Sequence, residues 1–197
     1  MSDVNLLTVF VDASRDHETS AGGYGAWAKH GGMRTGLLFG GHIRNSLTPT
    51  DAEIQAVRNA LYDLWNRGEI PKGCRRVLVQ TDSTTAISAY LTLDRASQSA
   101  KEHKASDHRP MFRSETLWSA VQDVEALLDA LDLKLILRHV YGHRVETTTR
   151  YSVQARCDEI AYENMRNERR RLSGGKRRQR KPKHRRRKYC PDPKESI

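Results

Sequence analysis

Apolar residues gather in five short runs that predict the strands of a sheet. Leu6–Val11 is continuously apolar and partly β-branched, which predicts a strand buried on both faces. Gly22–Lys29 and Met33–Ile43 are separated by a glycine-containing turn signal and predict two further strands. Val77–Gln80 and Lys134–Val140 predict the last two. Three strands therefore come first, and two follow later in the chain.

Apolar residues at helical spacing separate the later strands. The predicted helices are Asp51–Arg67, Thr84–Leu91, Ser114–Leu131 and a last one from about Gln154 to Arg171. This order predicts an α/β domain. The first three strands form an antiparallel meander, and the last two, each reached through a helix, run parallel to the first. On the helices we expect Trp65, Leu117 and Trp118 to face the core.

Charge divides the chain unevenly. Residues 1–165 carry 19 Lys and Arg against 21 Asp and Glu, whereas residues 166–197 carry 15 against 3. Beyond Gly174-Gly175 the chain has no apolar spacing that could bury a core. We therefore predict a folded domain over residues 1–172 and a basic tail over 173–197, disordered unless bound. The tail is expected to bind polyanions non-specifically, with a solubilising tail or a nuclear-localisation signal as alternatives.

The cysteines and the hydropathy of the chain indicate the cellular compartment to expect. Cys74, Cys157 and Cys190 are odd in number and form no C-x-x-C pair, so a disulfide framework is not expected. No signal peptide is recognisable, and no apolar run approaches the roughly 20 residues that cross a bilayer. We expect a soluble cytoplasmic monomer without membrane contact, or a nuclear protein in a eukaryotic cell.

Acidic residues lie at the ends of two predicted strands and at the start of a predicted helix. Asp12 and Asp82 each come directly after a predicted strand, and the carboxyl ends of adjacent parallel strands meet at one edge. Glu53 lies in the first turn of a helix. Each aspartate alone is also accounted for as a turn or helix N-cap. Thr50 to Glu53 likewise has the form of a capping box, in which Glu53 would only begin the helix.

Asp158 shares the inward-facing stripe of the last helix with Ala161, Tyr162 and Met165. A buried carboxylate requires a salt bridge, a proton or a metal ion. Four carboxylates without a Cys/His cluster form a hard oxygen ligand set that suits Mg²⁺ or Mn²⁺ better than zinc. Two such ions about 3.5–4 Å apart can activate water and stabilise the leaving oxygen in phosphoryl transfer.

Several segments in order resemble the type 1 ribonucleases H over about Leu6–Arg166. They read VFVDAS, GGYGAWAK, TDAEIQAVRNAL, VLVQTDS, RPMFRSETLWSAV, HVYGH and ARCDEIA. The resemblance implies a five-stranded mixed sheet, three antiparallel strands then two parallel, with helices on both faces. It also implies an endonuclease that cuts the RNA strand of RNA–DNA hybrids, leaving 3′-hydroxyl and 5′-phosphate ends.

The same resemblance implies roles for individual residues. Two Mg²⁺ ions, with Mn²⁺ as a possible substitute, would be held by Asp12, Glu53, Asp82 and Asp158. His143 would assist proton transfer or product release from a mobile loop. The implied nucleic-acid contacts are Ser14, Arg15, Thr48, Lys101, Lys104, Arg109 and Arg113, although a merely solvated loop is the alternative for the last four.

Departures from the family pattern concern the substrate rather than the metals. The common DGS is DAS here, and the glycine-rich loop after the first strand is replaced by Arg15–Ser20. The Asn-Asn pair that reads 2′-hydroxyls in the family is Pro49-Thr50. The 2′-hydroxyl is what distinguishes RNA from DNA at a site. A DNA-structure-specific nuclease of the same fold and a non-catalytic nucleic-acid-binding protein are therefore the alternatives.

Overall fold

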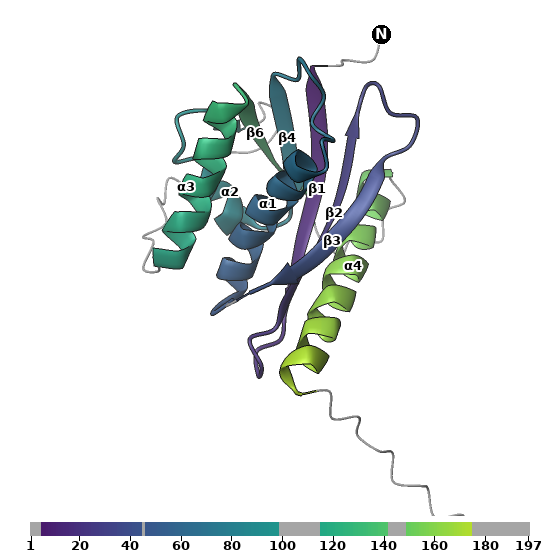
Figure 1. Ribbon diagram of the computed structural model, residues 1–197, viewed down its shortest axis with the longest axis vertical. Coiled ribbons are helices and arrows are strands. Elements are labelled where there is room, and N and C mark those ends of the chain that lie inside the picture. Colours follow the sequence, from purple (N-terminus) through teal and green to yellow (C-terminus); the bar gives the residue numbers. More distant parts are fainter. Residues whose placement is uncertain (1–4, 45, 99–114, 142–148, 175–197) are drawn as a thin grey trace, which may run out of the picture.

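The computed structural model describes residues 5–44, 46–98, 115–141 and 149–174 (Figure 1). The strands are β1 (Leu6–Arg15), β2 (Gly22–His30), β3 (Leu37–Ile43), β4 (Arg76–Thr81), β5 (Ala96–Gln98) and β6 (Lys134–His139). They form one sheet in the order β3-β2-β1-β4-β6-β5. β1, β2 and β3 pair antiparallel, whereas β4 pairs parallel to β1, and β6 pairs parallel to both β4 and β5. The predicted mixed sheet is confirmed.

The helices are α1 (Pro49–Asn66), α2 (Thr84–Tyr90), α3 (Glu115–Ala130) and α4 (Thr149–Leu172). α1 and α3 pack together on one face of the sheet, and α4 covers β1, β2 and β3 on the other (Figure 1). Successive strand residues alternate between these faces. In β1, Leu7 and Val9 join the main core under α1, whereas Phe10 joins a smaller core with Cys157 of α4. The apolar run is therefore buried on both sides, as predicted.

One additional strand and several element boundaries differ from the sequence prediction. The sheet has a sixth strand, β5, whose three residues are too few to show a pattern and which pairs at the edge with β6. The predicted strand Met33–Ile43 is wrong at its start, because a glycine-containing turn occupies residues 31–36. The last helix begins at Thr149 rather than about Gln154, because its first residues carry no clear apolar stripe.

The tryptophans of α1 and α3 lie outside the core, so their predicted burial is wrong. Trp65 is 46% exposed and Trp118 is 45% exposed. Trp65 packs its ring edge-on against Tyr62 at 5.8 Å instead. Leu117 is buried as expected. Because neighbouring helix residues point about 100° apart, Leu117 and Trp118 face different directions.

Two glycines of β2 let α4 lie directly on the sheet. A Cβ on Gly25 would overlap the carbonyl oxygen of Cys157, and one on Gly23 would overlap the backbone of Met165. Any larger residue at either position would push the helix away. The helix that carries Asp158 is therefore positioned by contact between backbones.

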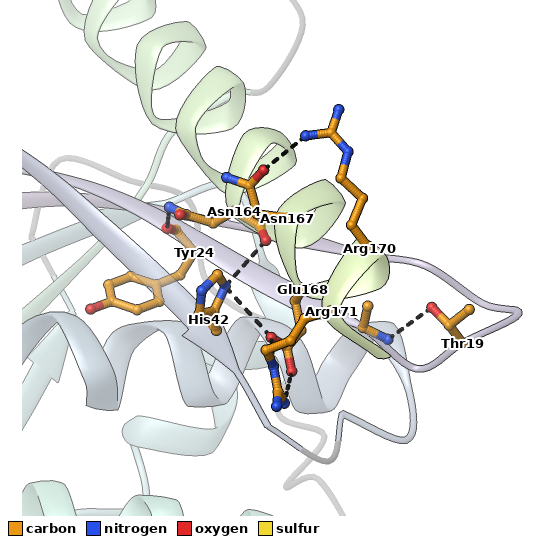
Figure 2. Close-up of polar contacts among 9 residues, drawn as sticks. Thr19, Tyr24, His42, Asn164, Asn167, Glu168, Arg170 and Arg171 are labelled. Atoms are coloured by element: carbon orange, nitrogen blue, oxygen red, sulfur yellow. Dashed lines mark hydrogen bonds and ion pairs between the residues drawn. The ribbon is translucent and has the colours of Figure 1, made fainter. Parts of the chain in front are cut away.

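Polar contacts fix the carboxyl-terminal half of α4 to the sheet (Figure 2). The Asn164 side chain donates to the carbonyl oxygen of Tyr24 at 3.2 Å. His42 Nδ1 lies 3.2 Å from the Asn164 carbonyl oxygen and 4.0 Å from the Glu168 carboxylate. Arg171 donates two hydrogen bonds to Glu168, which is only 3% exposed. Part of the basic segment that begins at residue 166 is therefore built into the folded helix.

Two cysteines and the helices α1 to α4 lie in the part of the chain that the structure describes. Cys74 and Cys157 are buried free thiols, and Cys190 lies outside the described residues. None of the helices in the described ranges has the length and hydropathy to cross a bilayer.

Candidate active site

Two carboxylates meet at the carboxyl edge of neighbouring parallel strands. Phe10 of β1 pairs with Gln80 of β4, and Asp12 and Asp82 each stand two residues further along. Asp12 lies within β1 instead of ending it. Its side chain is 7% exposed and accepts a hydrogen bond from the backbone N–H of Ala13 at 2.8 Å. The structure therefore brings the two aspartates to one edge of the sheet.

Glu53 reaches the same edge from the fifth residue of α1, just past its first turn. This helix is capped by Thr48, whose hydroxyl accepts from the Asp51 N–H at 3.0 Å while the Asp51 carboxylate accepts from the Thr48 N–H at 2.8 Å. The alternative of a capping box between Thr50 and Glu53 does not hold, because the helix already begins at Pro49, a residue suited to a first helical position. Glu53 is thus left out of the cap.

Asp12, Glu53 and Asp82 form a compact acidic group. Each contributes a carboxylate oxygen within 4.8 Å of the others. Burial, followed by the charge of Asp82 and then that of Asp158, raises the pKa of Asp12 to about 8. Burial, followed by the charges of Asp12, Asp82 and Asp158, raises the pKa of Glu53 to about 9. Without a compensating cation, the group therefore holds protons at neutral pH.

These three side chains fit a divalent cation. Glu53 Oε2 is buried and has no hydrogen-bond partner within the described part of the chain. A buried acceptor that lacks a partner costs about 1–3 kcal/mol, and more when it is charged. A hard cation at the centre of the group would satisfy this oxygen and relieve the mutual repulsion of the carboxylates.

Asp158 comes to the group from the opposite face of the sheet, on α4. It lies outside the 4.8 Å set, yet its charge contributes to the raised pKa of both Asp12 and Glu53. Of its predicted inward stripe, Ala161 and Met165 are buried. Tyr162 is 50% exposed, so its predicted place in that stripe is wrong.

Gln154 is a residue of the site that the sequence analysis missed. It lies one turn before Asp158 and is only 4% exposed. Its side-chain nitrogen donates to the carbonyl oxygen of Val11 at 3.3 Å, and a side-chain hydrogen bond from Gln154 lowers the pKa of Asp12. The amide therefore contacts the strand segment that presents Asp12. Its spacing of four residues from Asp158 was the available signal.

Hydrogen bonds from neighbouring elements hold the backbone of the turn after β4, which carries Asp82. His139 Nε2 lies 3.0 Å from the Asp82 carbonyl oxygen, and the Ser83 N–H donates to the Thr81 hydroxyl at 3.2 Å. Ser83 in turn caps α2 by accepting from the Ala86 N–H at 3.1 Å. The backbone around Asp82 is therefore fixed by neighbouring elements.

Other predicted site residues are placed only in part. Arg15 donates to the carbonyl oxygen of Ser46 at 2.8 Å, and Thr48 is the cap of α1. Ser14 lies in β1, near its carboxyl end. The predicted residues outside the described ranges are His143, Lys101, Lys104, Arg109 and Arg113.

Comparison with known proteins agrees with this architecture. Residues 5–166 match the sequence model of the RNase H family. No protein with a curated description matches the chain. The N-terminal RNase H domain of rv2228c from Mycobacterium tuberculosis, solved as a fusion with maltose binding protein, superposes with a TM-score of 0.57 at 16% identity, covering 84% of this chain and 97% of that one.

Two further solved structures have the same fold. LC11-RNase H1, isolated from compost by a metagenomic approach and solved with an RNA/DNA hybrid, gives a TM-score of 0.58 at 16% identity over 82% of this chain and 97% of that one. RNase H1 from the archaeon Halobacterium salinarum gives 0.54 at 16% identity, over 82% and 98%. The structural likeness shows the fold, and the family match spans most of the chain. The protein therefore belongs to the RNase H family and is a ribonuclease H-type endonuclease.

Proposed function

We propose that this endonuclease hydrolyses the RNA strand of RNA–DNA hybrids, using two Mg²⁺ ions held by Asp12, Glu53, Asp82 and Asp158. The observation that carries the proposal is the buried acidic group, in which Glu53 Oε2 lacks a partner among the described residues. A structural neighbour, LC11-RNase H1, was solved with an RNA/DNA hybrid, which supports this choice of substrate.

Each residue has a distinct part in this proposal. Divalent cations bound at the group would polarise a water molecule and stabilise negative charge on the leaving oxygen. Asp12 and Asp82 present their carboxylates from adjacent strands, while Glu53 and Asp158 approach from helices on opposite faces. Gln154 orients the segment that carries Asp12. His143 is proposed to assist proton transfer or product release.

Cleavage of strand-labelled duplexes tests the proposal. The wild type is expected to cut the RNA strand of a hybrid in Mg²⁺ and to leave matched duplex DNA intact. Asp82→Asn should abolish cutting, whereas Asp94→Asn is a matched control because Asp94 is exposed and outside the acidic group. A hybrid that the wild type leaves uncut would contradict the proposal.

A DNA-structure-specific nuclease is the second candidate, favoured by one observation at the start of α1. Pro49 occupies the first helical position, where it offers neither a backbone N–H nor a side-chain amide to a 2′-hydroxyl. Cleavage of branched DNA, with the hybrid left uncut, would select this candidate.

We also propose that residues 1–172 are the catalytic domain and that residues 173–197 bind polyanions. The composition supports this division, because most of the basic residues after residue 165 lie in 173–197. Such a segment would raise the local concentration of nucleic acid through counterion release, without taking part in the cut.

A further inference from the structure

A groove of about 490 Å³ lies on the α4 side of the sheet, next to the first turn of that helix. We call it the sheet groove. Its floor includes Phe10 and Gln80, a paired couple of β1 and β4 that precede Asp12 and Asp82 by two residues. Two strand residues span about 6–7 Å. One end of the sheet groove therefore lies beside the acidic group, and the groove runs from there along β1 towards Leu6 and His30.

An aromatic platform forms one wall of the sheet groove. Trp27 meets Phe10 edge-on, with ring centroids 5.8 Å apart. The indole also packs directly on Gly36, where a Cβ would overlap the ring. Leu78 completes the apolar floor. Phe10 and Gly36 hold the indole in place, so Trp27 is a fixed aromatic side chain in the lining of the groove.

Gln80 supplies a polar group on this apolar floor. Its side chain is 3% exposed, and its Oε1 has no hydrogen-bond partner among the described residues. An acceptor buried in this way is satisfied by a ligand that brings an N–H or O–H donor. The ligand must therefore be partly apolar and carry a donor.

Positive charge surrounds the floor. Lys29, Arg138 and Arg150 line the sheet groove, and no described lining residue is acidic. The cations come from three different elements, β2, β6 and α4. Charge complementarity therefore favours an anion, and the volume is within the range of small-ligand sites.

We propose that the sheet groove binds one nucleotide of an unpaired strand that extends from the substrate duplex. The base stacks on Trp27 and donates an N–H to Gln80, while phosphates lie against Lys29 and Arg150. Every nucleobase offers an N–H on its pairing edge, and both contacts require a base outside a duplex. An acidic peptide would satisfy the cations but has no equal need for the platform. The inference rests on the proposed nuclease function and specifies its substrate as a hybrid with a single-stranded extension.

Binding to non-cleaved duplexes tests the inference independently of catalysis. Asp82→Asn protein in Mg²⁺ is titrated by fluorescence anisotropy with blunt hybrid and with hybrids carrying 3′ or 5′ extensions. One extension polarity is expected to bind about tenfold more tightly than the blunt duplex, within the range for stacking of one base. Abasic nucleotides in that extension should remove the gain. Equal affinity for normal and abasic extensions would overturn the proposal.

Substitutions assign the gain to the sheet groove. Trp27→Leu and Gln80→Leu, made separately in the Asp82→Asn protein, should each reduce the preference for the extension. Gln80→Leu is expected to fold, because it removes a buried acceptor that has no partner among the described residues. If the preference survives in every folded variant, the sheet groove is not the site.

Charge reversal requires a matched control, since lost cations weaken all nucleic-acid binding. Lys29→Glu/Arg150→Glu should abolish the preference for the extension. Lys72→Glu/Lys134→Glu removes as many cations at exposed positions outside the groove and should retain it. An equal effect of both pairs would contradict the proposal. So would a Glu- and Trp-containing peptide that binds the groove while the nucleic-acid extension does not.

Discussion

Asp51 and Glu53 stand two residues apart near the start of α1, and their carboxylates have opposite surroundings. The Asp51 carboxylate accepts from the backbone N–H groups of Leu47 and Thr48, at 3.1 and 2.8 Å. Glu53 Oε2 is buried without a partner among the described residues. Residues two apart on a helix point about 200° apart. The helix therefore separates the residue that begins it from the residue it delivers to the site.

Glu53→Gln is expected to inactivate the enzyme while stabilising the metal-free fold. Cleavage should fall by more than about 100-fold. Loss of a residue that only supports a metal ligand costs up to about 100-fold, and Glu53 is proposed as a ligand itself. At neutral pH the folded Glu53 keeps a proton that the unfolded chain releases, and a neutral Gln removes this cost, so the metal-free Tm should rise by about 2–4 °C. Differential scanning calorimetry with excess chelator measures this shift, and a lowered Tm would contradict it.

Asp51→Ala serves as the matched control at the other end of this pair. Loss of the capping interaction costs about 1 kcal/mol, so the Tm should fall by about 2–4 °C. Cleavage at saturating Mg²⁺ should remain close to that of the wild type.

Stability without metal is expected to fall as pH rises. Asp12 and Glu53 have folded pKa values of about 8 and 9, against ordinary values of 3.8 and 4.5. The unfolded chain therefore releases these protons first, and stability declines from about pH 4 until both folded groups have ionised. Calorimetry at pH 6 and pH 8.5 should show the lower Tm at pH 8.5. Mg²⁺ should raise the Tm more at pH 8.5, and a metal effect independent of pH would argue against binding at this group.

Gly25→Ala is expected to disturb the site from beneath α4. The added Cβ meets the Cys157 carbonyl oxygen, so the helix must shift and carry Asp158 with it. Overpacking of this kind costs about 1–3 kcal/mol. Both the Tm and the Mg²⁺ affinity measured by titration calorimetry should fall. Gly32→Ala is the control, because its Cβ meets only the His30 side chain.

Gln154→Leu is expected to weaken metal binding without unfolding the protein. The buried amide contacts the Val11 carbonyl oxygen beside Asp12, and loss of such an outer partner reduces metal affinity about 10–100-fold. Asn at this position should restore less than the native residue, because its side chain is one methylene shorter. Unchanged affinity in titration calorimetry would remove Gln154 from the site.

Truncation after Gly174 tests the proposed tail. The shortened protein should melt at the wild-type temperature and cut a saturating hybrid at the wild-type rate. Its affinity for nucleic acid should be lower, with a shallower dependence on salt, because fewer counterions are released. An unchanged salt slope would show that the tail does not contact the substrate.

Strong local patterns accounted for most of the fold. Burial could be predicted from the run Leu6–Val11 and from the periodic apolar residues of α1 and α3. Hydrophobic side chains fill the core on both faces of the sheet, so these patterns follow it. β5 escaped prediction because three edge residues are held by pairing with β6 rather than by a pattern of their own. The position of the α1 cap escaped because Thr48 and Thr50 both begin a plausible capping sequence, and only Pro49 decides between them.

The candidate acidic residues were chosen from the sequence, but the buried amides were missed. Asp12 and Asp82 follow apolar runs, and a carboxylate at such a position attracts attention. Gln80 and Gln154 are ordinary surface residues by type, and their burial depends on elements distant in the chain. A polar residue inside a buried strand or stripe is therefore a signal for further site residues.

The proposed metal ligands come from both layers around the sheet, with Glu53 on α1 and Asp158 on α4. A bound cation would therefore act as a reversible cross-link between α1 and α4, which pack on opposite faces of the sheet. Like a disulfide, it would restrict the separation of distant segments, but chelation would open it. Hydrogen exchange in the first turns of α1 and α4 would then slow as the Mg²⁺ concentration rises. The stability of the fold would vary with the same Mg²⁺ concentration that sets the rate of cleavage.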